Sequence, residues 1–156
     1  MCMILKNGKI DKNHGKVNSD GCLVGYKVIY NNDHSLLYGW DKKWEEGLNR
    51  SNRRTTSFLN YEEHNGPVYK GFHIYLSKKA TKIYRERQKK DNSKNVRKNR
   101  GLKVIKVYYK PTDIVSYGYT KINEYKIRDG RMVDCSTKHL KTVVITKCMV
   151  KSLKGI

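Results

Sequence analysis

Apolar and polar residues alternate with a period of two in several stretches of the chain, which is typical of β-strands with one buried face. The clearest stretch is 69–76, where successive side chains fall on opposite faces. We expect one face in the core, and it carries Phe72, Ile74 and Leu76. The other face carries Tyr69, His73 and Tyr75.

The β-branched and aromatic content of other segments predicts further strands. They are 23–30, 35–40, 102–109, 113–117, 122–128 and 140–151. In the last of these, strict alternation divides the apolar residues between two faces. One face would carry Val143, Ile145 and Met149, and the other Val144, Cys148 and Val150.

Helical spacing appears in two places. Trp40, Trp44 and Leu48 suggest a short amphipathic turn. Ser77 is a good N-cap for a second helix, whose apolar stripe is Ala80, Ile83 and Tyr84. Beyond Tyr84 the residues are nearly all polar, so 85–100 is either a projecting helix or a loop.

These patterns predict one α+β domain with a largely antiparallel sheet of five to seven strands and one main helix after the third strand. The chain of 156 residues has room for one domain. We expect residues 1–22 to form a flexible leader and 23–156 to form the domain, with a basic helix or loop insertion at 78–100.

The charge of the chain is high and uneven. The formal net charge is +20, and residues 69–110 hold 15 basic and 2 acidic side chains. Such a field attracts polyanions, so we expect nucleic acid as the partner. The sequence has no long apolar segment and no secretory signal, which favours a protein of the cell interior that does not bind membranes. In that compartment we expect the four cysteines to be free thiols.

The expected contact surface is a basic ridge flanked by aromatic rings. Lysine and arginine would neutralise phosphates without reading sequence, and aromatic side chains would stack on bases. The candidates are Lys78, Lys79, Lys82, Arg85, Arg87, Lys89, Lys90, Lys94, Arg97, Lys98, Arg100, Tyr69, His73 and Tyr75. The open question is whether a second layer covers Tyr69, His73 and Tyr75, which would make these rings ordinary packing.

Motifs for cofactor or metal chemistry are missing from the sequence. There is no phosphate-binding loop, G-x-S-x-G, H-E-x-x-H or C-x-x-C. Cys135 and His139 have a ligand-like spacing, but one such pair does not make a zinc site. We therefore predict no cofactor and no metal.

The middle of the chain is similar to a pattern in small uncharacterised bacteriophage proteins. The matching segments are 71–80 and 104–118, with an opening at Gly25-Tyr-Lys-Val28 and a final strand at Val143-Val-Ile145. The resemblance covers about residues 24–150 and implies a viral or mobile-element origin, a compact α+β fold and a site of action inside a host cell. It implies no activity.

Two alternatives stay open. The strand at 71–77 followed by a helix resembles the middle motif of ADP-ribosyltransferases, which would nominate Lys27, His73, Tyr75 and Glu124 for dinucleotide binding and catalysis. Gly25-Tyr-Lys-Val28 lacks the Arg or His usual in the first motif of that fold. The second alternative is a host-factor or defence-system inhibitor, because an acidic protein surface would attract the same basic ridge.

Overall fold

The computed structural model describes the backbone of residues 3–6, 17–35, 43–51, 56–57, 68–69, 71–92 and 101–156. Within these ranges it describes the side chains of residues 17–35, 43–51, 71–87, 101–114, 118–120, 128–131 and 140–156. Within these ranges the main sheet has eight antiparallel strands in the order β1-β8-β9-β6-β2-β7-β10-β3, and β4 and β5 form a separate pair. The elements in chain order are β1 (Met3–Lys6), β2 (Leu23–Tyr30), β3 (Gly47–Arg50), β4 (Thr56–Ser57), β5 (Val68–Tyr69), β6 (Phe72–Tyr75), α1 (Lys78–Asn92), β7 (Leu102–Tyr109), a 3-10 turn (Pro111–Asp113), β8 (Ile114–Arg128), β9 (Arg131–Ile145) and β10 (Lys147–Val150).

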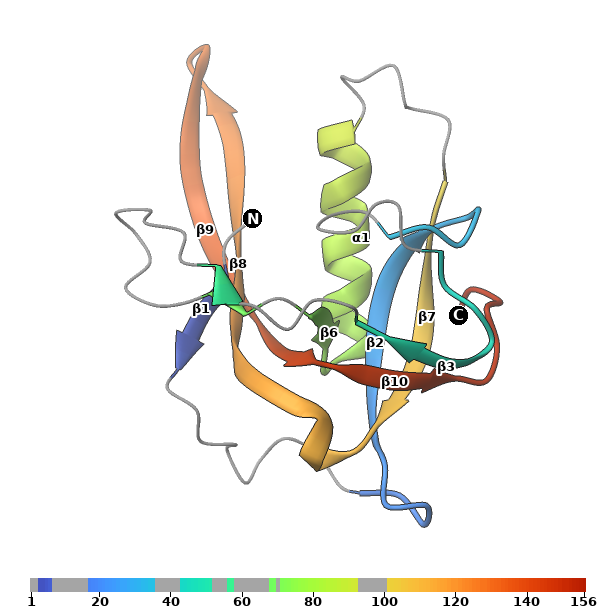
Figure 1. The fold of residues 1–156 in the computed structure, drawn as a ribbon. Coiled ribbons are helices and arrows are strands. Elements are labelled where there is room, and N and C mark those ends of the chain that lie inside the picture. The colour runs from blue at the N-terminus through green and yellow to red at the C-terminus, as the bar shows by residue number, and fades with distance from the viewer. Residues whose placement is uncertain are drawn as a thin grey trace.

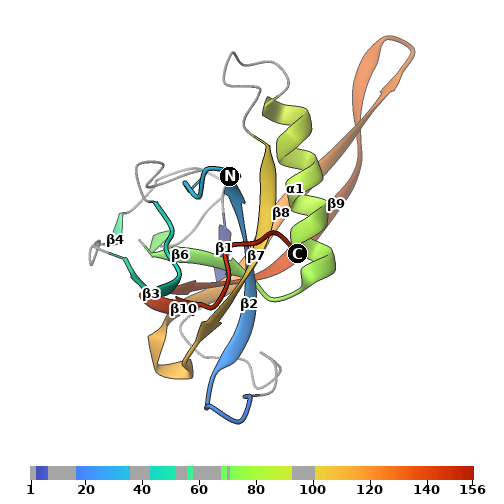
Figure 2. The same ribbon diagram turned by 90° about the vertical axis from the view of Figure 1, so that its right-hand side faces the viewer.

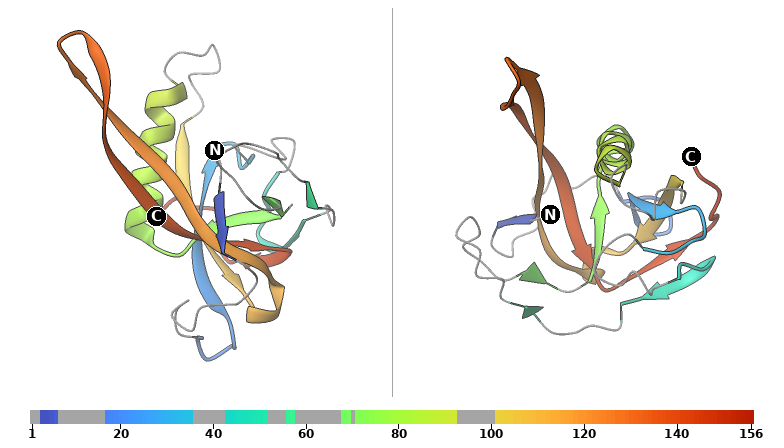
Figure 3. Two further views of the ribbon diagram at one scale, coloured as in Figure 1. Left: turned by 90° about the vertical axis from the view of Figure 1, so that its left-hand side faces the viewer. Right: turned by 90° about the horizontal axis from the view of Figure 1, so that it is seen from above.

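The α+β class, the dominance of antiparallel strands and the helix after the strand at 72–75 agree with the sequence-based prediction, whereas the main sheet has eight strands and not the five to seven expected. Figure 1 shows α1 lying against β2 and β7, while β10 and β3 cross the lower part of those strands. The β8–β9 hairpin extends beyond the rest of the sheet, which the rotated views in Figure 2 and Figure 3 also show.

Apolar clusters occupy both faces of the sheet. One face holds a core of buried residues, namely Leu23, Ile29, Trp44, Phe72, Ile74, Ile105, Val107, Tyr109, Val143, Ile145, Cys148 and Val150. On the other face α1 covers a smaller cluster made by Val28, Tyr75, Tyr84, Leu102, Val104 and Leu140. Phe72 and Ile74 therefore lie in the core, as the alternation predicted.

Several predicted boundaries were wrong. The segments 113–117 and 122–128 belong to one long strand, β8, which pairs with β9 to form the hairpin. Part of the expected leader is strand β1, because residues 3–6 pair with β8 at the sheet edge. The predicted strand at 35–40 is described only at Ser35, which bridges Ile29.

The helical turn expected around Trp44 is not seen within the described residues 43–51. Leu48 instead belongs to β3, which pairs with β10, and its side chain is exposed. Trp44 is fully buried, and its ring lies 4.6 Å from that of Phe72 between centroids. Trp40 lies outside the described residues.

The predicted strand 140–151 is two strands separated by a bend at Thr146. The Thr146 amide donates to the carbonyl of Asp113 (3.0 Å), and the Thr146 carbonyl accepts from the amide of Ser51 (2.8 Å). Because the bend uses one residue, it reverses the alternation, and Cys148 and Val150 share a core with Val143 and Ile145. Met149 is consequently exposed, contrary to its predicted grouping with Val143 and Ile145.

Candidate nucleic-acid interface

The helix α1 begins where the sequence predicted. The Ser77 hydroxyl accepts a hydrogen bond from the Ala80 amide (3.2 Å), and the Thr81 hydroxyl donates to the Ser77 carbonyl (2.7 Å). These bonds satisfy polar groups of the first turn. The helix then continues to Asn92 and carries the ridge residues from Lys78 to Lys90 on a rigid element.

Three ridge residues lie on one line along the helix. Lys78, Lys82 and Arg85 are spaced i, i+4 and i+7, which places them within about 60° of one another around the axis. Lys78 is exposed, and Lys82 and Arg85 are partly exposed. We call these three residues the cationic flank.

The remaining ridge residues fall into separate groups. Lys79 is exposed, and Arg87 emerges on the side opposite Arg85 because two positions rotate the helix by about 200°. The ridge is therefore not one surface: Arg87 is separated from the cationic flank by the body of the helix. Lys89 and Lys90 are described by their backbone in α1, and the remaining candidates lie outside the described residues, namely Lys94, Arg97, Lys98 and Arg100.

One carboxylate lies next to the cationic flank. Glu86 contacts Arg85, with 3.2 Å between the Arg85 guanidinium and a Glu86 carboxylate oxygen. In the described part of the chain, no carboxylate is within ion-pair distance of Lys78 or Lys82. Among the described carboxylates, only that of Glu86 therefore offsets charge on the cationic flank, through its contact with Arg85.

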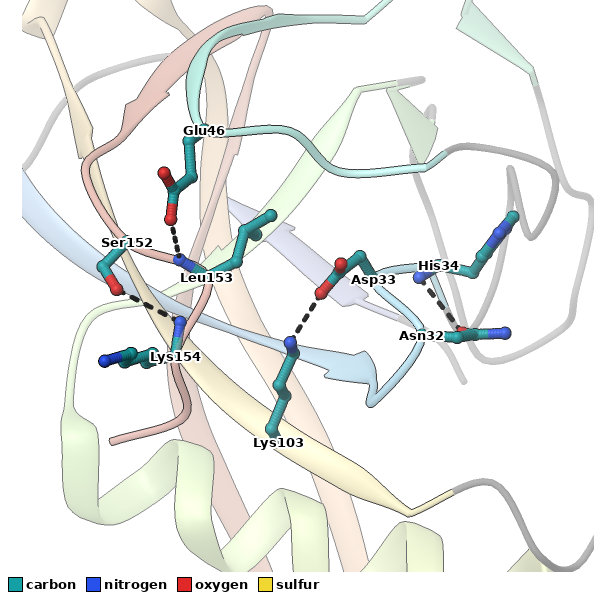
Figure 4. Close-up of polar contacts among 8 residues, drawn as sticks. All are labelled: Asn32, Asp33, His34, Glu46, Lys103, Ser152, Leu153 and Lys154. Carbon is teal, nitrogen blue, oxygen red and sulfur yellow. Dashed lines mark hydrogen bonds and ion pairs between the residues drawn. The ribbon is translucent and has the colours of Figure 1, made fainter.

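Several of the described acidic side chains are engaged elsewhere in the fold. Asp33 pairs with Lys103, and a Glu46 oxygen accepts from the Leu153 amide at 3.2 Å, as Figure 4 shows. Asp113 is buried, accepts from the Lys110 amide (3.1 Å) and lies 3.8 Å from the Lys147 amine. These contacts engage the carboxylates of Asp33, Glu46 and Asp113 with loops and the C-terminal segment, and not with the cationic flank.

The aromatic part of the predicted site differs from the expectation. Tyr75 is buried beneath α1, with its ring 4.9 Å from that of Tyr84 between centroids. Burial raises the pKa of Tyr75 well above its usual value. The ring of Tyr75 cannot stack on a base, because α1 covers it. For Tyr75 the helix is therefore the second layer whose presence the sequence could not decide. His73 is partly exposed, and the side chain of Tyr69 lies outside the description.

The structure does not bring the four transferase nominees together. Tyr75 pairs directly with Tyr26, so Lys27, the next residue, points to the opposite face of the sheet from Tyr75 and His73. On β9, Glu124 pairs with Ser136 and Tyr75 pairs with Thr142. These two partners are six residues apart along β9, which separates the backbone of Glu124 from that of Tyr75 by about 20 Å. The strand order thus gives no support to a shared catalytic site.

Sequence reasoning missed cationic residues on β7 and near β10. Lys106 and Lys151 are exposed, and the Lys151 amine lies 4.4 Å from the centroid of the Tyr108 ring. The alternation within 102–109 could have placed Lys106 and Tyr108 on one face, but it could not show that β10 brings Lys151 to the same place.

Comparisons of this chain with protein family models, with curated proteins and with solved structures found no match. Within the described residues, no group of three or more His, Cys, Asp or Glu side chains could hold a metal ion. In the same part of the chain, no helix has the length and apolar character needed to cross a membrane. Cys22 and Cys148 form no disulfide, and Cys135 and His139 are not among the described side chains.

Proposed function

We propose that this chain binds nucleic acid through the cationic flank of α1, with little sequence specificity. The observation that carries the proposal is the alignment of Lys78, Lys82 and Arg85 on one side of a capped helix, where Glu86 is the one described carboxylate that contacts them. Lysine and arginine contacts to phosphates supply affinity that does not depend on base sequence.

The surrounding charge supports the same partner. The formal net charge of +20 produces a long-range field that raises the local concentration of polyanions and speeds their encounter with the protein. The resemblance of residues 24–150 to small bacteriophage proteins supports the further proposal that the chain meets this partner inside a host cell.

The experiment compares two variants that each lose four positive charges. The first replaces Lys78, Lys79, Lys82 and Arg85 with Gln, and the control makes the same change at Lys110, Arg128, Arg131 and Lys141, which are exposed and belong to other elements than α1. Binding of a fluorescent 20-base-pair duplex is measured by anisotropy at low salt, and circular dichroism verifies the fold of both variants. We expect the first variant to lose at least about tenfold in affinity and the control to lose much less.

Equal losses in the two variants would mean that net charge alone, and not α1, determines binding. An acidic protein partner would give a different result. Capture of the partner from a cell lysate would then survive nuclease treatment, whereas a nucleic-acid partner would be released by it.

A further inference from the structure

An apolar row crosses four adjacent strands on one face of the sheet. Val24 of β2 is opposite Tyr108 of β7, Tyr108 is opposite Met149 of β10, and Met149 is opposite Leu48 of β3. Directly opposed residues share a face, so these four side chains are neighbours. Leu48 and Met149 are 48% and 44% exposed, and Val24 and Tyr108 are partly exposed. We call these four residues the apolar row.

The apolar row lies on the same face of the sheet as α1. The helix packs near Tyr26, Tyr30, Leu102 and Val104, which are the even-numbered positions of β2 and β7. Val24 and Tyr108 are also even-numbered, so their side chains are on this same face. Tyr75 pairs with Tyr26 and α1 starts three residues after Tyr75, so Val24 and Tyr108 lie beyond the first turn of the helix. The helix covers one part of this face and leaves the apolar row open.

Cationic side chains surround the apolar row. Lys106 is two residues from Tyr108 on β7, Arg50 is two residues from Leu48 on β3, and both are exposed. Lys151 lies over the Tyr108 ring. The nearby carboxylate of Glu46 accepts a hydrogen bond from the Leu153 amide, so it is held at the C-terminal segment.

We propose that the apolar row binds the bases of single-stranded nucleic acid while the phosphates contact Lys106, Lys151 and the cationic flank, an inference that rests on the proposed function. An aromatic ring and apolar side chains within a cationic border complement a ligand that combines flat apolar bases with negative charge. A duplex hides the faces of its bases and can use the cations alone. A second copy of this chain would bring like charges together, which opposes self-association on this face.

The contact between Lys151 and Tyr108 is compatible with this inference. A cation over an exposed aromatic ring is held more weakly than a base stacked on that ring. The base therefore displaces the Lys151 amine, which moves to the adjoining phosphate. Sheets that bind single strands in this way use their aromatic side chains to stack two or three bases.

The test uses three fluorescent probes, namely a 20-nucleotide oligothymidylate, a 20-base-pair duplex and a peptide of 20 glutamates. Tyr108→Leu keeps an apolar side chain but removes the flat ring, and Tyr108→Phe keeps the ring. Leu48→Ser and Met149→Ser change positions of the row that are 48% and 44% exposed, and circular dichroism verifies the fold of each variant. Val17→Ser is the control, because Val17 is 49% exposed and is not part of the row.

We expect Tyr108→Leu to lower affinity for the oligothymidylate by about 5- to 150-fold, the effect of losing one stacked base, with less than twofold change for the duplex. Leu48→Ser and Met149→Ser should act in the same direction, and Tyr108→Phe and Val17→Ser should bind like the original chain. Equal loss for both nucleic acids, or no loss for the single strand, would overturn the assignment of the row while leaving duplex binding by α1 intact. Binding of the glutamate peptide and of neither nucleic acid would overturn the row and the proposed function together.

Discussion

The Lys27 amine donates a hydrogen bond to the main-chain carbonyl of His73, with 3.1 Å between the two atoms. The bond crosses a weak position in the sheet, because β2 pairs with β6 only at Tyr26 and Tyr75, whereas it pairs with β7 along its whole length. The Lys27 side chain thus adds a link between β2 and β6, which have few backbone hydrogen bonds to each other. Burial lowers the pKa of this amine to about 8 from 10.5.

The lowered pKa of Lys27 predicts a pH-dependent contribution to stability. Below about pH 8 the amine is protonated in the folded and unfolded chains, so its burial penalty is fully present. Between about pH 8 and 10.5 the unfolded chain keeps the proton that the folded chain has lost, so the free energy of unfolding rises with pH. Urea unfolding at pH 7, 8, 9 and 9.5 should show the original chain gaining stability relative to Lys27→Met. Lys106→Met, at an exposed position on β7, is the control. Parallel curves for the original chain and Lys27→Met would contradict this prediction.

Trp44 and Ser35 give a second prediction about the core. The Trp44 indole N–H donates to the Ser35 hydroxyl at 2.7 Å, and both residues are buried. Ser35→Ala leaves that N–H without its partner away from water, which should lower the free energy of unfolding by about 1–3 kcal/mol. Thermal or urea unfolding measures the change. Ser152→Ala is the control, because the Ser152 hydroxyl accepts from the Lys154 amide at an exposed position (Figure 4) and its loss should cost less than about 0.5 kcal/mol. Equal effects at the two positions would show that the Trp44 bond contributes little.

Gly25 gives a third prediction, because two core side chains occupy the space beside it. A Cβ atom at this position would overlap Cγ2 of Ile74 and lie 3.1 Å from Cε1 of Tyr109. Ile74 is fully buried, so Gly25→Ala should cost about 1–3 kcal/mol of stability through overpacking. Ile74→Leu removes the obstructing Cγ2 methyl at nearly constant volume. In a double-mutant cycle measured by urea unfolding, Ile74→Leu should therefore recover part of the loss, and strict additivity would contradict the steric explanation.

The strand pattern could be predicted from the sequence where a strand runs without interruption. Phe72 and Ile74 fell in the core because β6 keeps a regular alternation. Tyr75 could not be assigned in the same way, because its burial depends on α1 folding back over the sheet, which is a tertiary contact. The start of α1 was predictable because the Ser77 cap is a local interaction.

The apolar row shows where local reasoning fails. Its Met149 is exposed because the bend at Thr146 reverses the alternation, and that bend is held by Asp113 and Ser51, which are distant in sequence. The same limit applies to Leu48, whose pairing with Met149 replaced an expected helical turn. The charge of α1 was visible in the sequence, whereas the division of Arg85 and Arg87 between two sides required the helix to continue beyond Tyr84.

Glu86 offers a fourth prediction, in which a substitution strengthens binding. The Glu86 side chain is 55% exposed and its carboxylate contacts Arg85, so it offsets one charge of the cationic flank and repels an approaching phosphate. Glu86→Gln should raise affinity for the 20-base-pair duplex about 1.4- to fivefold at low salt, in line with the roughly 0.2–1 kcal/mol of one exposed charge pair. Because an exposed ion pair contributes little to stability, the free energy of unfolding should change little. Anisotropy titrations measure the affinity, and Glu45→Gln, at an exposed position before β3, makes the same change in net charge as the control. A gain that is equal for the two variants would assign the effect to net charge, and no gain for Glu86→Gln would remove Arg85 from the contact surface.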